Sequence, residues 1–159
     1  TWDMYQEYPE VFAGVAPASA LFPIRNNPFG KSIEDGWNTT VPVPMFYSGG
    51  EKSHVPELPF QAESGLDRIQ YAAEVNKLKK KFNVTYADKE SWENPIWGVN
   101  GDRVEVIRDE ARDSNLTIHY FDSEDGVCRT AFANIDNQVH ECRHHTNEVA
   151  WKFISKFTR

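Results

Sequence analysis

Residue types that could do chemistry gather near one end of the chain, in the run His140-Glu141-Cys142-Arg143-His144-His145. The run spells H-E-x-x-H, in which two histidines one helical turn apart bind zinc and the glutamate activates a water molecule. That motif requires a helix, whereas the helical spacing of apolar residues here begins only after Thr146. The nearest downstream acid, Glu148, lies a further turn along, too far to join the same ion. A zinc peptidase acting through His140 and His144 is therefore the third hypothesis, and we expect neither a metal nor another cofactor.

A second interpretation treats His140 as a general base. The sequence places it in the loop after the last expected strand, directly before the last expected helix. A histidine there can accept a proton when an acid on a neighbouring strand-end loop orients it. Two acids follow the expected strand over residues 41–47: Glu51 comes directly after the glycine turn, and Glu57 lies a few residues on. If these are ordinary loop acids and His140 is a surface residue, the chain is instead a non-catalytic binding or interaction domain.

The elements that must position these residues follow from hydrophobic periodicity. Strands are expected over residues 11–16, 41–47, 104–108, 116–121 and 127–135. Helices are expected over residues 64–82 and 149–157, and residues 1–8 are typical of the tail of another helix. Turn residues separate the last three strands, which favours pairing as hairpins. The order predicts an α/β fold in which strands separated by a helix are parallel.

Residues 17–40 form an irregular stretch broken by prolines and glycines, which predicts an insertion or lid. It carries three large aromatic side chains, Phe22, Phe29 and Trp37. We expect these side chains to form a surface on which an apolar or aromatic acyl group packs. The alternative is that they belong to the hydrophobic core.

Composition limits the classes of partner. The 159 residues include 24 acidic and 17 basic side chains, a net charge of −7 that argues against nucleic acid. No apolar run reaches the length of a membrane span, and the first residues do not have the pattern of a signal peptide, so we expect no membrane partner. These features leave the cellular compartment open. Length and a 40% hydrophobic share fit a single domain over residues 1–159.

Three segments resemble a known family. They are residues 8–19 (YPEVFAGVAPAS), 41–50 (VPVPMFYSGG) and 150–159 (AWKFISKFTR). The first resembles the segment that follows the nucleophile helix in α/β-hydrolases of the polyhydroxybutyrate depolymerase and feruloyl esterase type. The second resembles the strand before the acid loop of that family, and the third resembles its final helix. The resemblance implies the carboxyl-terminal half of an α/β-hydrolase sheet, mostly parallel and flanked by helices, with a short lid and a β-hairpin excursion.

The resemblance also implies a chemistry, hydrolysis of a small or polymer-linked carboxylic ester through an acyl-enzyme. The family serine lies in a G-x-S-x-G turn, which this sequence does not contain. We therefore expect the serine in a segment before Thr1, so that the domain is incomplete at its amino terminus and the chain alone is inactive. The family histidine corresponds to His140, with His144 or His145 as the fallback. The family acid is usually an aspartate, for which Glu51 substitutes, with Glu57 as the alternative.

Two further expectations concern the chain as a whole. A half sheet leaves an apolar edge and face uncovered, which predicts association with the missing amino-terminal half or with a second copy of the chain. Thr1 could instead act as an amino-terminal nucleophile with its own α-amino group as base. Such enzymes need the threonine at the start of a strand, whereas Thr1 precedes a helical stretch.

Overall fold

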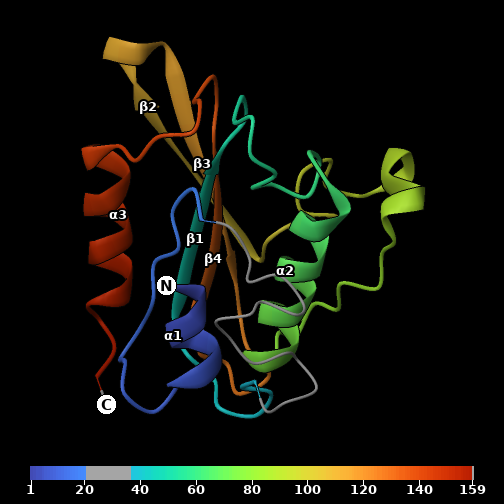
Figure 1. Cartoon of the computed structure of the whole chain (residues 1–159), viewed down its shortest axis with the longest axis vertical. Coiled ribbons are helices and arrows are strands. Elements are labelled where there is room, and N and C mark those ends of the chain that lie inside the picture. The colour runs from blue at the N-terminus through green and yellow to red at the C-terminus, as the bar shows by residue number, and fades with distance from the viewer. Residues whose placement is uncertain (21–36, 159) are drawn as a thin grey trace.

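The computed structural model describes residues 1–20 and 37–158 (Figure 1). Its helices are α1 (Trp2–Glu7), α2 (Glu63–Val75) and α3 (His144–Ile154), with 3₁₀ turns η2 (Tyr86–Ser91) and η3 (Glu110–Arg112). Its strands are β1 (Met45–Gly50), β2 (Arg103–Asp109), β3 (Ser114–Phe121) and β4 (Thr130–Ile135). No helix within the described ranges is both long and apolar enough to cross a lipid bilayer.

The four strands form one mixed sheet in the order β1-β4-β3-β2. β1 and β4 are parallel, in a register that places Met45 opposite Thr130 and Gly50 opposite Ile135. The other two pairs, β4 with β3 and β3 with β2, are antiparallel. The expectation of a mostly parallel half-sheet of the α/β-hydrolase type is therefore wrong. The hairpin strands are part of the sheet itself and not an excursion from it.

Connection length explains the strand directions. A crossover to a parallel neighbour takes a dozen or more residues. Residues 122–129 join β3 to β4, and a single short turn around η3 joins β2 to β3, so both links allow only antiparallel pairing. Only β1 and β4 are separated by a long connection, which contains α2. The hairpin pairing expected between the alternating segments is thus present, and it accounts for the antiparallel half of the sheet.

The strand expected over residues 11–16 is reduced to isolated bridges. Val15 pairs with Met45 and Ala18 pairs with Ser48, both parallel to β1. Val11 is 65% exposed, so the apolar run is not fully buried. Pro17 has no N–H to continue the ladder. The segment therefore borders the outer edge of β1 without forming a full fifth strand.

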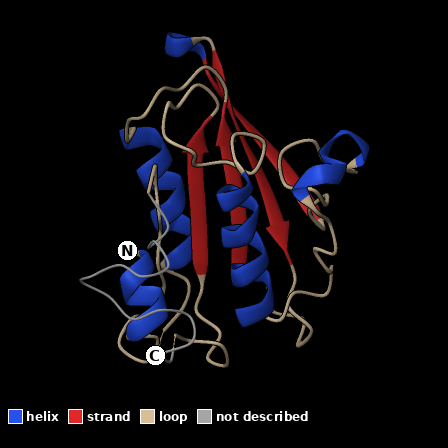
Figure 2. Cartoon of the chain, turned by 45° about the vertical axis from the view of Figure 1, so that its right-hand side comes forward, coloured by secondary structure: helices blue, strands red, loops and turns tan. Residues whose placement is uncertain are grey.

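The sheet separates two hydrophobic cores, because successive side chains of a strand point to opposite faces. Tyr47 and Phe132 belong to the core that includes Ile69 of α2. Phe46 belongs to the core that includes Phe153 of α3. Figure 2 shows α2 and α3 on opposite sides of the sheet. Both strands of the parallel pair are buried along their whole length, so their carboxyl ends have fixed positions.

Helix α2 ends earlier than its apolar spacing predicts. Its last residue is Val75, whereas the spacing favours helix to residue 82. Lys77 follows with a φ of +50°, the left-handed conformation. The N–H groups of Lys77 and Leu78 then donate to the carbonyls of Glu74 and Ala73. This is the Schellman arrangement, in which a left-handed residue terminates a helix although the apolar pattern continues beyond it.

Candidate functional site

The loops that follow β1 and β4 meet at one edge of the sheet. Residues 51–62 leave β1 and residues 136–143 leave β4 from neighbouring positions, because Gly50 lies opposite Ile135. A Cβ atom on Gly50 would lie 2.5 Å from the Gln138 carbonyl oxygen, so this approach requires glycine. The two loops are therefore in direct backbone contact at this edge.

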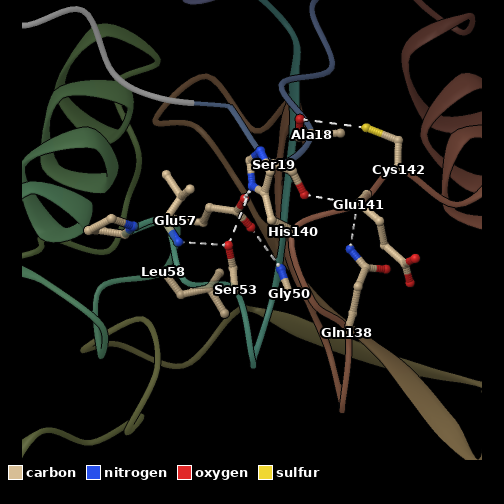
Figure 3. Close-up of polar contacts among 12 residues, drawn as sticks. Ala18, Ser19, Gly50, Ser53, Glu57, Leu58, Gln138, His140, Glu141 and Cys142 are labelled. Atoms are coloured by element: carbon tan, nitrogen blue, oxygen red, sulfur yellow. Dashed lines mark hydrogen bonds and ion pairs between the residues drawn. The ribbon is translucent and has the colours of Figure 1, made fainter.

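Glu57 is a fully buried carboxylate on the first of these loops, and both its oxygens are engaged (Figure 3). Oε2 accepts the Gly50 N–H at 3.1 Å. Oε1 contacts Nδ1 of His140. A buried carboxylate is strongly disfavoured unless its oxygens are hydrogen-bonded, and these two contacts give each oxygen a partner. A carboxylate that accepts from Nδ1 also assigns the imidazole proton to that nitrogen, which leaves the lone pair on Nε2.

His140 lies between Glu57 and solvent, with its side chain 37% exposed. Ser53 Oγ lies 3.4 Å from Nδ1, on the same nitrogen that Glu57 contacts. The ring of His54 stands edge-on to the His140 ring, with centroids 5.5 Å apart. Within residues 1–20 and 37–158, no hydroxyl group is hydrogen-bonded to Nε2. Nε2 is therefore the nitrogen left to accept a proton from a bound molecule.

The side chain of Gln61 folds the first loop back on itself. Its carbonyl oxygen accepts the N–H groups of Glu57 and Leu58 at 2.9 and 3.0 Å. Its amide donates to the carbonyls of Gly50 and Glu51 at 3.0 and 2.9 Å. One side chain thus joins both ends of the loop. Because the loop is folded in this way, the carboxylate of Glu57 lies beside the end of β1.

Tyr47 and Arg68 support Glu57 from the core. The Tyr47 hydroxyl is hydrogen-bonded to the Glu57 carbonyl. Arg68 donates to the Pro56 carbonyl at 2.7 Å and to the Tyr47 hydroxyl at 3.3 Å. Burial raises the pKa of Tyr47, which keeps the phenol neutral, while the nearby Arg68 charge acts in the opposite direction. The apolar spacing of residues 64–82 predicts that Arg68 faces solvent. This prediction is wrong, because the residue is only 3% exposed.

The backbone of the second loop is held on either side of His140. The carbonyl of Glu141 accepts the Ser19 hydroxyl at 3.0 Å and the Gln138 amide at 2.9 Å. The backbone N–H of Ser19 in turn donates to the Ser48 carbonyl of β1 at 3.0 Å. Three segments far apart in the sequence therefore converge beside the imidazole, and Figure 3 shows Ser19 next to His140.

Ser19 adopts a left-handed backbone conformation, with a φ of +46°. This conformation is unfavourable for residues that carry a side chain, whereas glycine adopts it without strain. We expect Ser19→Gly to be more stable than Ser19→Ala by about 1 kcal/mol, because both lose the hydroxyl but only alanine keeps the strain. Urea unfolding of the two variants measures the difference.

The hydroxyl itself is tested by hydrogen exchange at residues 138–141. Exchange there should rise in both Ser19 variants, since each loses the hydrogen bond to Glu141. Unchanged exchange in both variants would show that this contact does not hold the loop, and equal stabilities of the two would show that the Ser19 backbone is not strained.

The other candidate residues lie elsewhere. Glu51 accepts the Asn137 N–H through Oε2 at 2.8 Å, so it joins the two loops but is not the partner of His140. His144 is the first residue of α3 and its Nε2 lies 3.9 Å from Glu148 of the same helix. His145 follows in the first turn of α3. Of the residues that sequence reasoning proposed, the structure brings together Glu57 and His140.

The H-E-x-x-H run is split between two conformations. His140 lies in the loop, whereas His144 begins α3, so the two side chains do not share a helix face. In the parts of the chain that the structure describes, no three His, Cys, Asp or Glu side chains are grouped to hold a metal ion. His140 and His144 therefore do not adopt the arrangement on one helix face that a zinc peptidase needs.

The aromatic residues of the expected lid divide into two groups. Phe22 and Phe29 lie outside the described residues. Trp37 is 4% exposed, and its ring centroid lies 6.0 Å from that of Tyr71 on α2. Trp37 therefore packs in the interior and does not present a surface to a substrate in this structure.

The residues that sequence reasoning missed around the site are Ser19, Tyr47, Gln61, Arg68 and Gln138. Ser19, Tyr47 and Arg68 contact other segments of the chain, whereas Gln61 and Gln138 bond within their own loops, and no local motif marks any of them. The one sequence signal is the glycine pair that ends β1, where the loops approach each other. Comparison with protein-family models and with curated proteins finds no match to this chain.

Proposed function

We propose that His140 and Glu57 are the general base and the orienting acid of a hydrolase that cleaves carboxylic esters through a serine nucleophile. The observation that carries the proposal is the buried Glu57 carboxylate, fixed by the Gly50 N–H and in contact with Nδ1 of His140. In a non-catalytic binding domain these would be unrelated surface residues. A buried glutamate in contact with a partly exposed histidine favours the catalytic interpretation, because a Ser-His-acid triad uses such a pair to orient its base.

The chemistry follows from the two ring nitrogens. Nε2 of His140 accepts the serine proton as the serine oxygen attacks the ester carbonyl carbon, and the Glu57 carboxylate stabilises the imidazolium. The imidazolium then gives that proton to the leaving alcohol, and the acyl group stays on the serine. Water, deprotonated by Nε2, attacks the acyl carbon, and return of the proton to the serine oxygen releases the acid. Within the described residues no serine hydroxyl is hydrogen-bonded to Nε2, so the nucleophile in this proposal is the serine that covalent labelling identifies.

The test uses the protein as its gene encodes it, with p-nitrophenyl esters of a short and a longer acyl chain and with a fluorophosphonate probe. We expect ester hydrolysis, covalent labelling of one serine, and loss of both in His140→Ala. His54→Ala is the matched control, because it removes the neighbouring imidazole, and it should keep activity and labelling. Mass spectrometry of the labelled peptide identifies the serine. A protein that is neither labelled nor able to hydrolyse these esters, or full activity in His140→Ala, would contradict the proposal.

A further inference from the structure

The two edges of the sheet differ. The outer edge of β1 is bordered by residues 15–18, through the bridges of Val15 and Ala18. β2 is the terminal strand on the other side, and no strand within residues 1–20 and 37–158 pairs with its outer edge. An unpaired edge presents a row of backbone donors and acceptors that can bind another strand. In Figure 1 the tip of the β2–β3 hairpin extends away from α2, and most residues of β2 are exposed.

The side chains of β2 are exposed along most of the strand. Val104 and Val106 are 48% and 59% exposed and lie on the same face, two residues apart. Arg103 and Asp109 stand at the two ends of the strand and carry opposite charges. Within the chain, Arg103 is ion-paired with Glu105 at 3.4 Å and Asp109 with Arg112 at 3.2 Å, surface pairs that contribute little stability. β2 therefore carries opposite charges at its two ends and exposed valines between them, and an antiparallel copy of the same strand complements such a pattern.

We propose that β2 pairs antiparallel with β2 of a second copy of the chain, about a two-fold axis at Val106. Because the partner strand is β2 itself, each residue of the strand has a defined residue opposite it. Arg103 lies opposite Asp109 of the second copy at both ends, and Val106 lies opposite its own equivalent. Val104 lies opposite Arg108, whose alkyl stem covers it.

Symmetry restricts the register. A two-fold axis perpendicular to a sheet requires opposed residues to share a face, so the pairing can slip only by two residues at each step. One slip centres the pair on Glu105, which places two glutamates opposite each other. The other slip centres it on Ile107, which places Glu105 opposite Asp109. Because like charges directly opposite are destabilising, the register centred on Val106 is favoured over both neighbours.

Charge reversal tests this pairing on the full chain. Arg103→Asp and Asp109→Arg each place like charges opposite one another at both ends, and each should weaken the dimer about tenfold. The double variant R103D/D109R restores opposite charges and should regain wild-type dimerisation. Glu10→Lys, at an exposed residue in the segment that precedes the bridges to β1 at the other edge of the sheet, is the control and should have no effect. Analytical ultracentrifugation over a wide concentration range measures the equilibrium.

Circular dichroism and thermal unfolding of each variant separate lost folding from lost association. A wild-type protein that stays monomeric at high concentration overturns the proposal. A dimer that neither single charge reversal weakens, or that the double variant fails to restore, shows that the chain associates through another surface. These outcomes are independent of ester hydrolysis, because none of the substituted residues contacts His140 or Glu57.

Discussion

Glu57→Gln is expected to lower kcat for ester hydrolysis about 10³- to 10⁴-fold. The amide keeps the size of the carboxylate but carries no charge, so it neither stabilises the imidazolium nor holds the proton on Nδ1. The imidazole proton of His140 then resides on Nε2, the nitrogen nearest the nucleophile, so Nε2 cannot accept another proton. KM should change little, because Glu57 is buried behind the imidazole and contacts no substrate in this proposal.

Glu51→Gln is the matched control for this prediction. Glu51 lies on the same loop, but its carboxylate accepts the Asn137 N–H and does not contact His140. A neutral amide oxygen can accept the same hydrogen bond, so kcat should stay within about threefold of wild type. If Glu51→Gln lost as much activity as Glu57→Gln, the assignment of the acid to Glu57 would be wrong. Steady-state kinetics on a p-nitrophenyl ester compares the two variants.

The second large effect concerns stability. Phe132 of β4 is fully buried, and its ring centroid lies between 5.2 and 6.4 Å from those of four neighbouring aromatic rings, Tyr47, Phe82, Trp97 and Phe121. Phe132→Ala removes the side chain at the centre of this cluster and leaves a cavity. We expect a loss of about 3–5 kcal/mol in the free energy of unfolding. For a chain of this length that corresponds to a decrease of roughly 10 °C in Tm.

Trp151→Ala provides the comparison for Phe132→Ala. Trp151 lies on α3 and is 66% exposed, so its removal leaves no buried cavity. Its effect on the free energy of unfolding should stay within about 0.5 kcal/mol. Thermal unfolding monitored by circular dichroism gives both values. A similar Tm for the two variants would mean that the aromatic cluster does not carry the stability of the α2 side of the sheet.

Sequence reasoning predicted the site in part. It placed His140 in a loop between the last strand and the last helix, because the alternating pattern ends before residue 136 and the helical spacing begins later. It named Glu51 as the acid and Glu57 as the alternative, since both lie on the same polar loop and Glu51 comes directly after the glycine turn. Which of the two carboxylates reaches His140 depends on Gln61. Gln61 folds the loop so that Glu57 returns to the sheet, while Glu51 is hydrogen-bonded to Asn137.

Local patterns determined the hairpin strands, the strand that ends at Gly50 and the last helix, because alternation, turns and helical spacing act between residues close in the chain. Tertiary packing decided the direction of β1 relative to the other strands, the burial of Arg68 and the pairing of Glu57 with His140. The last two residues are 83 positions apart. Their contact depends on the register of two strands and on a loop folded against the core. Hydrophobic periodicity shows which face of each strand is buried, but it does not show which strand lies beside it or which loop side chains then meet.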